Sequence, residues 1–429
     1  MAGRPDTIFA LSSGRPPAGI GVIRISGPRA GAALQAVFGK MPHPRRAEYG
    51  AFRSVDEKPL DRGLAIWFPG PETATGEDLA ELHCHGGRAV VNAIERRLAS
   101  IYGLREAEPG EFTRRALENG RIDLAEAEGL ADLLAAETEM QRAMALSMAG
   151  GALSRQAEAW REEVLRLSAL VEGALDFSDE DDVADEPAGL RDGLVALQNE
   201  LDEWLSRPRA EMLGEGFTVV LAGPPNSGKS TLFNALVESE AAITSPIAGT
   251  TRDVVTRSVA LDGVPFRFVD TAGLRDIADA DAIEAIGIGR AQDEVGRADL
   301  VLWLGEESEG PEGAWEIDAQ IDREGHIAKR DSVAAVSAVT GVGLTELRKA
   351  IIECATQHLP KPGEAALNAR QAAALADVSS GVSSALMVSD LLLVGEGLRT
   401  ARAGFDRLVG RTGTEDMFDA LFGRFCVGK

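Results

Sequence analysis

The sequence predicts an α/β domain at the amino end, followed by a helical domain into which a P-loop α/β nucleotide-binding domain is inserted. Three observations support this fold class. Short strand-like runs fill the first segment, and apolar residues then recur at helical spacing. Residues 223–230 read Gly-Pro-Pro-Asn-Ser-Gly-Lys-Ser, which matches the phosphate-binding pattern G-x-x-x-x-G-K-[ST]. We place the domain segments at residues 1–120, 121–213, 214–361 and 362–429, with the second and fourth forming one helical domain.

The amino-terminal segment carries the signals of a sheet covered by helices. Strands are expected at residues 7–10, 20–25, 63–68 and 78–84, where short runs are bounded by turn residues. A helix is expected at 90–100, with Arg96 and Arg97 on its polar face.

Helical periodicity dominates from Asp123 to Ser206 and returns after a Pro-Lys-Pro-Gly linker at 360–363. The apolar stripes recur every three or four residues, as on one face of a helix. They are Trp160, Val164, Leu167, Val171 and Ala174, then Leu190, Leu194, Leu197, Leu201 and Leu205, and finally Leu375, Val378, Val382 and Leu386. The acidic run at 179–186 is expected to be an exposed loop.

Composition and net charge restrict the classes of protein to which this chain can belong. The formal charge of −24 repels nucleic acid on average, so an RNA substrate would need a basic patch or a partner. Arg45-Arg46 and the basic residues of 114–121 are the candidate patches, although a solvated surface is the simpler interpretation. Three scattered cysteines predict no disulfide framework, and no apolar run approaches the ~20 residues of a membrane span. We therefore expect a cytoplasmic protein that does not enter a membrane.

The P-loop and the motifs that follow it predict a GTPase site. Lys229 is expected to contact the β- and γ-phosphates, and Ser230 to bind Mg²⁺. Thr251 would supply a second Mg²⁺ ligand from a switch loop. Asp270, at the end of a strand at 266–269, would support the metal, and the backbone N–H of Gly273 would approach the γ-phosphate.

Leu274 departs from the pattern of many GTPases, which carry a Gln here to orient the attacking water. One interpretation is a slow binding switch. The other is that a different residue positions water, and Glu284 is the candidate for this catalytic role. Arg252 and Arg275 are weaker candidates for an arginine finger.

The base-recognition motif also departs from the usual Asn-Lys-x-Asp, because this chain has Ala319-Gln320-Ile321-Asp322. Asp322 still has the carboxylate that accepts from the guanine N1 and N2 hydrogens. Ser337-Ala338 lies where a backbone N–H commonly contacts guanine O6. We expect GTP as the substrate, with weaker discrimination between bases.

Several further motifs extend along the chain, and they resemble one family, the tRNA modification GTPase MnmE (TrmE) family. They are Asp6-Thr7-Ile8, residues 21–27, Thr75-Gly76-Glu77-Asp78, residues 81–87, Pro109-Gly110-Glu111-Phe112-Thr113, residues 119–124, Ala127-Glu128 and the terminal Cys426-Val427-Gly428-Lys429. The terminal Cys-x-Gly-Lys after a central GTPase is the most specific of these.

The resemblance implies a homodimer formed through the amino-terminal domain, working with the flavoprotein MnmG. Together such proteins add an aminomethyl or carboxymethylaminomethyl group to carbon 5 of the wobble uridine of certain tRNAs. The one-carbon unit comes from 5-formyl-tetrahydrofolate or a related tetrahydrofolate. The resemblance implies folate contacts from Arg24, Glu81, Arg121 and Lys429, of which position 121 is more often Lys. A surface or helix-capping role is the alternative for each.

The family also uses K⁺, for which the resemblance implies ligands from Asn226, Ser245, Ile247 and Thr250. The cation would take the place of an arginine finger, with Glu284 acting when two GTPase domains meet. The GTP-binding set implied by the motifs and the resemblance together is Asn226, Ser227, Gly228, Lys229, Ser230, Thr231, Ser245, Pro246, Ile247, Ala248, Gly249, Thr250, Thr251, Asp270, Thr271, Ala272, Gly273, Asp322, Ser337 and Ala338.

Two features stay open. Cys426 is either a nucleophile toward uridine carbon 6 or a packing residue of the folate pocket. His83 and His85 share one face of a strand, which suits either a metal site or, more simply, a structural pair. A ribosome-assembly GTPase that binds ribosomal RNA is the alternative function, but the net charge and the terminal Cys-x-Gly-Lys favour tRNA modification.

Overall fold

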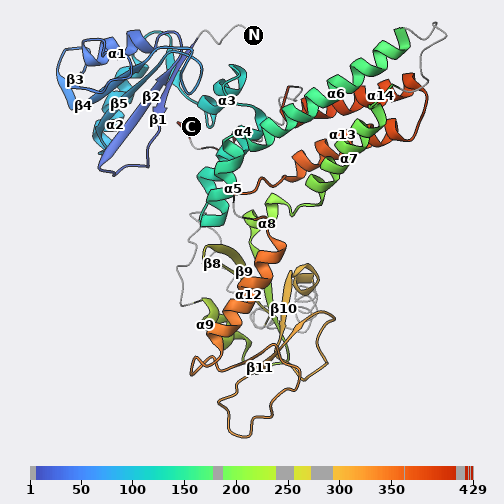
Figure 1. The fold of residues 1–429 in the computed structure, drawn as a ribbon. Helices are drawn as coiled ribbons and strands as arrows, with labels where there is room; N and C mark the ends of the chain where they lie inside the picture. Colours follow the sequence, from blue (N-terminus) through green and yellow to red (C-terminus); the bar gives the residue numbers. More distant parts are fainter. Residues whose placement is uncertain are drawn as a thin grey trace, which may run out of the picture. The chain divides into compact units, whose positions relative to one another are not determined.

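A computed structural model describes residues 6–176, 187–237, 256–271, 293–361, 363–411, 421–423, 425 and 427–428. Its contacts divide the chain into two compact units. One consists of Met1–Ala131, Leu153–Arg161 and Arg402–Lys429, and the other of Asp132–Ala152 and Glu162–Ala401. Each unit contains one six-stranded sheet (Figure 1). Within the described residues, no helix has the length and apolar character that crossing a membrane requires.

The first unit contains a sheet with the strand order β3-β4-β5-β2-β1-β6, in which only the β1–β6 pair is parallel. Helices α1 and α2 pack against this sheet over a core that includes Phe9, Ile23 and Leu82. The bounds are β1 (Thr7–Leu11), β2 (Ile20–Ser26), α1 (Ala30–Phe38), β3 (Glu48–Arg53), β4 (Pro59–Phe68), β5 (Leu79–His85), α2 (Arg88–Ala99), β6 (Leu104–Glu106) and α3 (Glu111–Glu118).

The four predicted strands correspond to β1, β2, the second half of β4, and β5. The sequence did not predict strands β3 and β6, because both are edge strands. Strand β3 is mostly half-exposed and pairs only with β4 in the described sheet, so its side chains show no clear apolar alternation.

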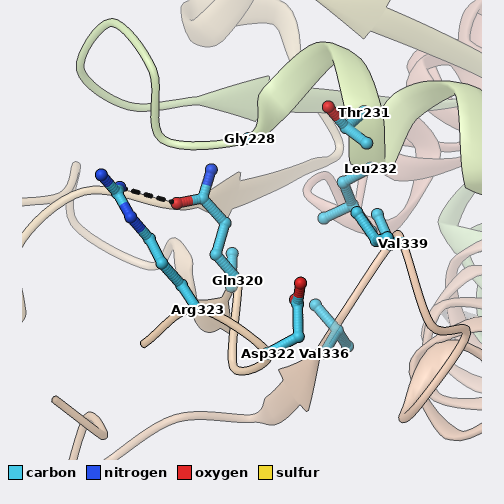
Figure 2. Close-up of a pocket in the computed structure, with 10 residues that line it drawn as sticks. Gly228, Thr231, Leu232, Gln320, Asp322, Arg323, Val336 and Val339 are labelled. Carbon is cyan, nitrogen blue, oxygen red and sulfur yellow. Dashed lines mark hydrogen bonds between the residues drawn. The ribbon is translucent and has the colours of Figure 1, made fainter. Parts of the chain in front are cut away.

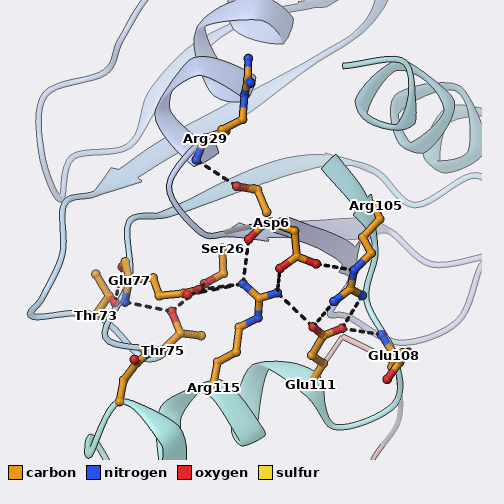
Figure 3. Close-up of polar contacts among 12 residues, drawn as sticks. Asp6, Ser26, Arg29, Thr73, Thr75, Glu77, Arg105, Glu108, Glu111 and Arg115 are labelled. Carbon is orange, nitrogen blue, oxygen red and sulfur yellow. Dashed lines mark hydrogen bonds and ion pairs between the residues drawn. The ribbon is translucent and has the colours of Figure 1, made fainter. Parts of the chain in front are cut away.

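A buried arginine holds the first unit together (Figure 3). Arg115 on α3 is 1% exposed and forms ion pairs with Glu77 at 3.2 Å, Asp6 at 3.1 Å and Glu111 at 3.0 Å. Arg105 on β6 binds the same Asp6 and Glu111, at 2.6 and 2.5 Å. The network therefore joins Asp6, the edge strand β6, helix α3 and the Thr-Gly-Glu-Asp loop. The basic cluster at 114–121 is thus not a free cationic surface, which corrects one of the two patches considered from the sequence.

Burial by itself would raise the pKa of Glu111, but hydrogen bonds from Arg105, the Glu108 backbone and Arg115 outweigh it and lower that pKa. Burial also acts to raise the pKa of Asp6. The hydrogen bond and charge of Arg105 and the charge of Arg115 outweigh burial, so the pKa of Asp6 is lowered. A carboxyl group with a lowered folded-state pKa stabilises the fold above its unfolded pKa, and this contribution is lost as the pH falls through the folded-state value.

The helical elements come from both sides of the P-loop segment in sequence. Their bounds are α4 (Leu124–Ala135), α5 (Glu139–Ala149), α6 (Ala152–Asp176), α7 (Leu190–Ser206), α8 (Ala210–Glu215), α13 (Ala369–Leu386) and α14 (Leu391–Leu408). Helix α7 packs along α13, and Gln198 donates a hydrogen bond to Ser379 at 2.7 Å. Capping boxes at Thr138 and Asn368 begin α5 and α13. Helices α7 and α13, which come from opposite sides of the P-loop segment in sequence, therefore pack together within the second unit.

Helices α13 and α14 approach closely because both carry glycine at the contact. A Cβ on Gly381 would lie 2.7 Å from the carbonyl oxygen of Gly397, and a Cβ on Gly397 would lie 2.7 Å from that of Gly381. Any larger side chain would push the two helices apart.

The second sheet has the order β12-β11-β10-β7-β9-β8 and is parallel except for the β8–β9 pair. The bounds are β7 (Phe217–Ala222), α9 (Lys229–Val237), β8 (Thr256–Leu261), β9 (Val264–Asp270), β10 (Leu300–Trp303), β11 (Trp315–Ala319), β12 (Ala334–Val336) and α12 (Leu344–His358). Every residue of β7 is buried. The carboxyl ends of β7, β9, β10 and β11 therefore meet along one edge, where open parallel sheets bind ligands.

The Arg115 network generates a stability prediction with a matched control on the next residue. Arg115→Met removes the buried cation and leaves Asp6, Glu77 and Glu111 without it, which costs about 3–5 kcal/mol. Arg114, which pairs with Glu118 at 3.2 Å on the solvent side, is the control, and Arg114→Met should cost about 0–1 kcal/mol.

Amide hydrogen exchange measured by mass spectrometry reports the difference, because β1 and β6 peptides of Arg115→Met should exchange at least about 100-fold faster at neutral pH. The gap between the variant and the wild type should narrow as the pH falls through the folded-state pKa values of Glu111 and Asp6. Equal protection in the two arginine variants would contradict the structural role of Arg115.

Candidate functional site

The phosphate-binding loop lies between the buried strand β7 and helix α9. Three of its residues have positive φ angles, namely Gly223 at 150°, Asn226 at 64° and Gly228 at 92°. Glycine adopts such angles without penalty, and Asn tolerates them better than most residues. Alternating backbone handedness turns successive N–H groups toward one side of the loop, which creates a concave site for anions.

Lys229 is the first residue of α9 and is 5% exposed. Its Nζ donates hydrogen bonds to the carbonyl oxygens of Gly223 at 3.0 Å and Pro224 at 2.6 Å. The ammonium group is thus held against the loop by neutral acceptors. Because a phosphate oxygen is a stronger acceptor than a carbonyl, the group is poised to bind an anion at the positive end of the helix.

Strand β9 brings a second motif to the same edge of the sheet. Leu221 of β7 lies directly opposite Asp270 of β9 in the parallel register. Thr271 Oγ1 donates to the Leu221 carbonyl at 2.8 Å, which fixes the end of β9 beside the start of the loop. Asp270 is 5% exposed. The sequence analysis placed these residues together by motif alone, and the strand pairing supplies the geometry.

A cavity of about 240 Å³ adjoins the loop (Figure 2). It is lined by Gly228, Thr231, Leu232, Ala319, Gln320, Asp322, Arg323, Val336, Ala338 and Val339. Of the predicted nucleotide-binding residues, the structure therefore brings Gly228, Thr231, Asp322 and Ala338 together. Ser337 is fully buried next to the cavity, and its hydroxyl accepts a hydrogen bond from the Thr340 N–H at 3.0 Å.

Sequence reasoning missed the side-chain role of Gln320 and the contributions of Leu232, Arg323 and Val339 to this cavity. The available signal was the position of Gln320 within the altered base-recognition motif. The exposed residues Asn226 and Ser230 lie in the loop and at the start of α9, as predicted.

Part of the predicted site falls outside the described residues. These predictions concern Ser245, Pro246, Ile247, Ala248, Gly249, Thr250, Thr251, Ala272, Gly273, Glu284, Cys426 and Lys429, together with Arg252, Leu274, Arg275 and the acidic run at 179–186.

Arg24 and Glu81 lie side by side in the first sheet, directly opposite each other on β2 and β5. Arg24 Nη2 lies 3.0 Å from Glu81 Oε1, and the two side chains are 27% and 16% exposed. The Arg24 guanidinium also lies over the Phe112 ring, 5.9 Å from its centroid. A charged pair with an aromatic ring beside it, still open to solvent, suits a flat ligand with polar edges.

The carboxyl-terminal residues return to the same unit. The Ser12 hydroxyl donates to the Gly428 carbonyl at 2.7 Å, and Val427 forms an antiparallel bridge with Pro109. Ser12 follows β1, whose Ala10 lies opposite Arg24 in the sheet. Arg121 pairs with Glu72 at 3.1 Å and packs against Gly76 of the Thr-Gly-Glu-Asp loop.

His83 and His85 each pair with a different carboxylate, His83 with Glu81 at 3.2 Å and His85 with Asp61 at 2.8 Å. In the part of the chain that the structure describes, no group of three or more potential ligands could hold a metal ion. Cys84 lies between these two histidines in sequence. Burial, with a smaller contribution from the charge of Asp61, raises the pKa of its thiol to about 11. This thiol therefore stays protonated and unreactive near neutral pH.

Comparisons with known proteins find similar sequences along nearly the whole chain. The family model described as the GTP-binding protein TrmE N-terminus matches residues 7–121, and the model described as the MnmE helical domain matches residues 124–426. A tRNA modification GTPase MnmE from Novosphingobium aromaticivorans is 59% identical over 99% of this chain and 100% of its own length. A second, from Erythrobacter litoralis, is 58% identical over 99% of this chain and 100% of its own.

A third protein of this name, from Rhizorhabdus wittichii, is 55% identical and aligns with 100% of this chain and 98% of its own length. The amino-terminal domain, the split helical domain and the inserted P-loop domain are all within these alignments. The chain therefore belongs to the MnmE (TrmE) family of tRNA modification GTPases.

Proposed function

We propose that this protein is a GTP hydrolase that acts in the modification of tRNA. The observation that carries the proposal is the buried Lys229 ammonium at the phosphate loop, with Asp270 and Thr271 of β9 at the same edge of the sheet. The adjoining cavity presents the Asp322 carboxylate, which suits the two N–H donors on one edge of guanine.

The residues of the loop suit a magnesium-bound triphosphate. The positive φ angles form an anion cradle, and Ser227 Oγ is buried without a hydrogen-bond partner among the described residues, so one hydroxyl donor remains for an added acceptor. Ser230 and Thr251 are the proposed Mg²⁺ ligands. When bound, Mg²⁺ would neutralise charge on the phosphate oxygens.

Hydrolysis is proposed to depend on Glu284 and K⁺. Leu274 has no group that orients water, so a carboxylate elsewhere is needed for that role. Asn226, Ser245, Ile247 and Thr250 are the proposed K⁺ ligands, and Asn226 is exposed on the loop with its backbone in the left-handed region. A cation held here would offset negative charge on the phosphates, as an arginine finger does in other GTPases.

The first unit is proposed to bind a tetrahydrofolate, 5-formyl-tetrahydrofolate or a relative. Glu81 can accept hydrogen bonds from a pterin edge, and Arg24 can bind a carboxylate of the glutamate tail. Arg121 and Lys429 would add positive charge. The hydrogen bond between Ser12 and Gly428 holds the described carboxyl-terminal residues near this sheet.

The substrate is proposed to be the wobble uridine of certain tRNAs, modified at carbon 5 together with a flavoprotein partner, MnmG. The protein would act in the cytoplasm as a homodimer formed through its amino-terminal domain. A partner that contributes positive charge fits a chain whose own charge of −24 disfavours RNA.

The nucleotide site generates a paired prediction. Lys229→Ala should weaken GTP binding about 100-fold, because it removes a charge-assisted bond to the phosphates. Glu284→Ala should bind GTP normally but lose most of its hydrolysis, and K⁺ should support wild-type turnover better than Na⁺. Equilibrium binding of a fluorescent GTP analogue and phosphate-release assays measure the two properties.

Lys349→Ala is the matched control, because Lys349 is 79% exposed on α12 of the same domain. It should bind and hydrolyse GTP like the wild type. Full GTP affinity in Lys229→Ala would refute the proposed site, and full turnover in Glu284→Ala would remove Glu284 from the mechanism.

The folate site generates a separate prediction. Arg24→Ala should lower the affinity for 5-formyl-tetrahydrofolate about 10- to 100-fold, because it removes the planar cation and leaves Glu81 without its arginine partner. Arg96→Ala, at an exposed position on α2, should leave the affinity unchanged. Isothermal titration calorimetry distinguishes the two, and equal affinities in both variants would count against the site.

A further inference from the structure

The base-recognition motif, Ala319-Gln320-Ile321-Asp322, lacks two of the side chains that such motifs usually carry. The usual Asn and Lys of this motif are replaced by Ala319 and Gln320, and the alanine methyl has no polar group that could hold the phosphate loop. We propose that Gln320 is a specificity-determining residue, whose side chain forms one wall of the purine pocket and ties that wall to the phosphate loop. This inference rests on the proposed nucleotide site.

The first observation is a direct bond between two loops that are far apart in sequence. Gln320 Nε2 donates a hydrogen bond to the main-chain carbonyl of Asn226 at 3.1 Å. Asn226 lies inside the phosphate loop, and Gln320 directly follows β11. The bond therefore links the residues that hold the base to the residues that hold the phosphates.

The second observation is a close fit between Gln320 and Gly228. A Cβ on Gly228 would lie 3.0 Å from Gln320 Nε2 and 3.2 Å from Gln320 Cγ. The glutamine side chain thus lies against the bare backbone of the loop, with room that only glycine leaves. The φ angle of Gly228, 92°, would also strain any residue with a side chain at this position.

The third observation is that the amide of Gln320 is oriented at both ends. Its Oε1 accepts a hydrogen bond from Arg323 Nη1 at 3.4 Å, which leaves Nε2 to face Asn226. The Arg323 N–H also donates to the Gln320 carbonyl at 3.0 Å, closing a turn in which Gln320 has a φ of 60°. A non-glycine residue held at this angle is uncommon, so the turn is specified by its surroundings.

Figure 2 shows how the Gln320 side chain lies in the cavity. The Gln320 side chain rises toward Gly228, with Arg323 on one side and the Asp322 carboxylate on the other. Leu232 and Val339 lie across the cavity from it. A purine whose N–H edge meets Asp322 would therefore have one face against the Gln320 side chain and the other toward these apolar residues. Arg323 holds the Gln320 amide from the side away from Asp322.

Binding of GDP and of inorganic pyrophosphate to the full-length protein tests the inference, because pyrophosphate uses the phosphate loop but not the base pocket. Gln320→Met keeps the length and neutrality of the side chain and loses the amide, so GDP affinity should fall about tenfold while pyrophosphate affinity stays within about twofold. Gln320→Gly relaxes the strained φ angle, so it should fold at least as well as the wild type and still lose GDP affinity. Glu324→Met, in the same loop but outside the cavity lining, is the control and should match the wild type.

Wild-type GDP affinity in both Gln320 variants, or equal losses for GDP and pyrophosphate, would overturn the inference while the nucleotide site stands. A wild-type protein that binds neither ligand would overturn the nucleotide site and the inference together.

Discussion

The nucleotide site depends on the burial of β7. This strand is buried along its whole length and pairs in parallel with both β9 and β10, so its carboxyl end is fixed relative to two neighbours. The phosphate loop leaves from that end, and its positive φ angles curl the backbone around the place where Lys229 is held. Asp270 and Thr271 arrive at the same edge because β9 is in register with β7. A shift of either strand by one residue would separate these groups.

The first unit shows a different way of placing polar groups. Its polar residues are fixed by charge pairing within and beside a sheet. Arg115 and Arg105 gather three carboxylates, two of which, Asp6 and Glu77, come from distant parts of the chain. The Arg24–Glu81 pair lies on neighbouring strands of the same sheet but stays partly open to solvent. The buried ion pairs around Arg115 stabilise the fold, whereas the partly exposed Arg24–Glu81 pair can exchange one partner for a ligand.

The sequence was most informative where function depends on residues close together in the chain. The phosphate loop and Lys229 were predictable because one short motif contains both. Arg115 was misread as part of a surface cluster because its partners, Asp6 and Glu77, come from elsewhere in the chain. Gln320 was seen only as a missing Lys, since its bond to Asn226 depends on a left-handed backbone that no propensity predicts. Edge strands β3 and β6 lacked the apolar pattern that burial on two faces creates.

We expect phosphate chemistry at the end of β7 to be required for the modification of tRNA. This requirement is tested most directly by nucleoside analysis of tRNA from a strain that lacks the chromosomal gene and carries the wild-type, Lys229→Ala or Lys349→Ala protein at matched levels. The wild type and Lys349→Ala should restore the carbon-5 modification of wobble uridine, whereas Lys229→Ala should not. Full restoration by Lys229→Ala would contradict this requirement.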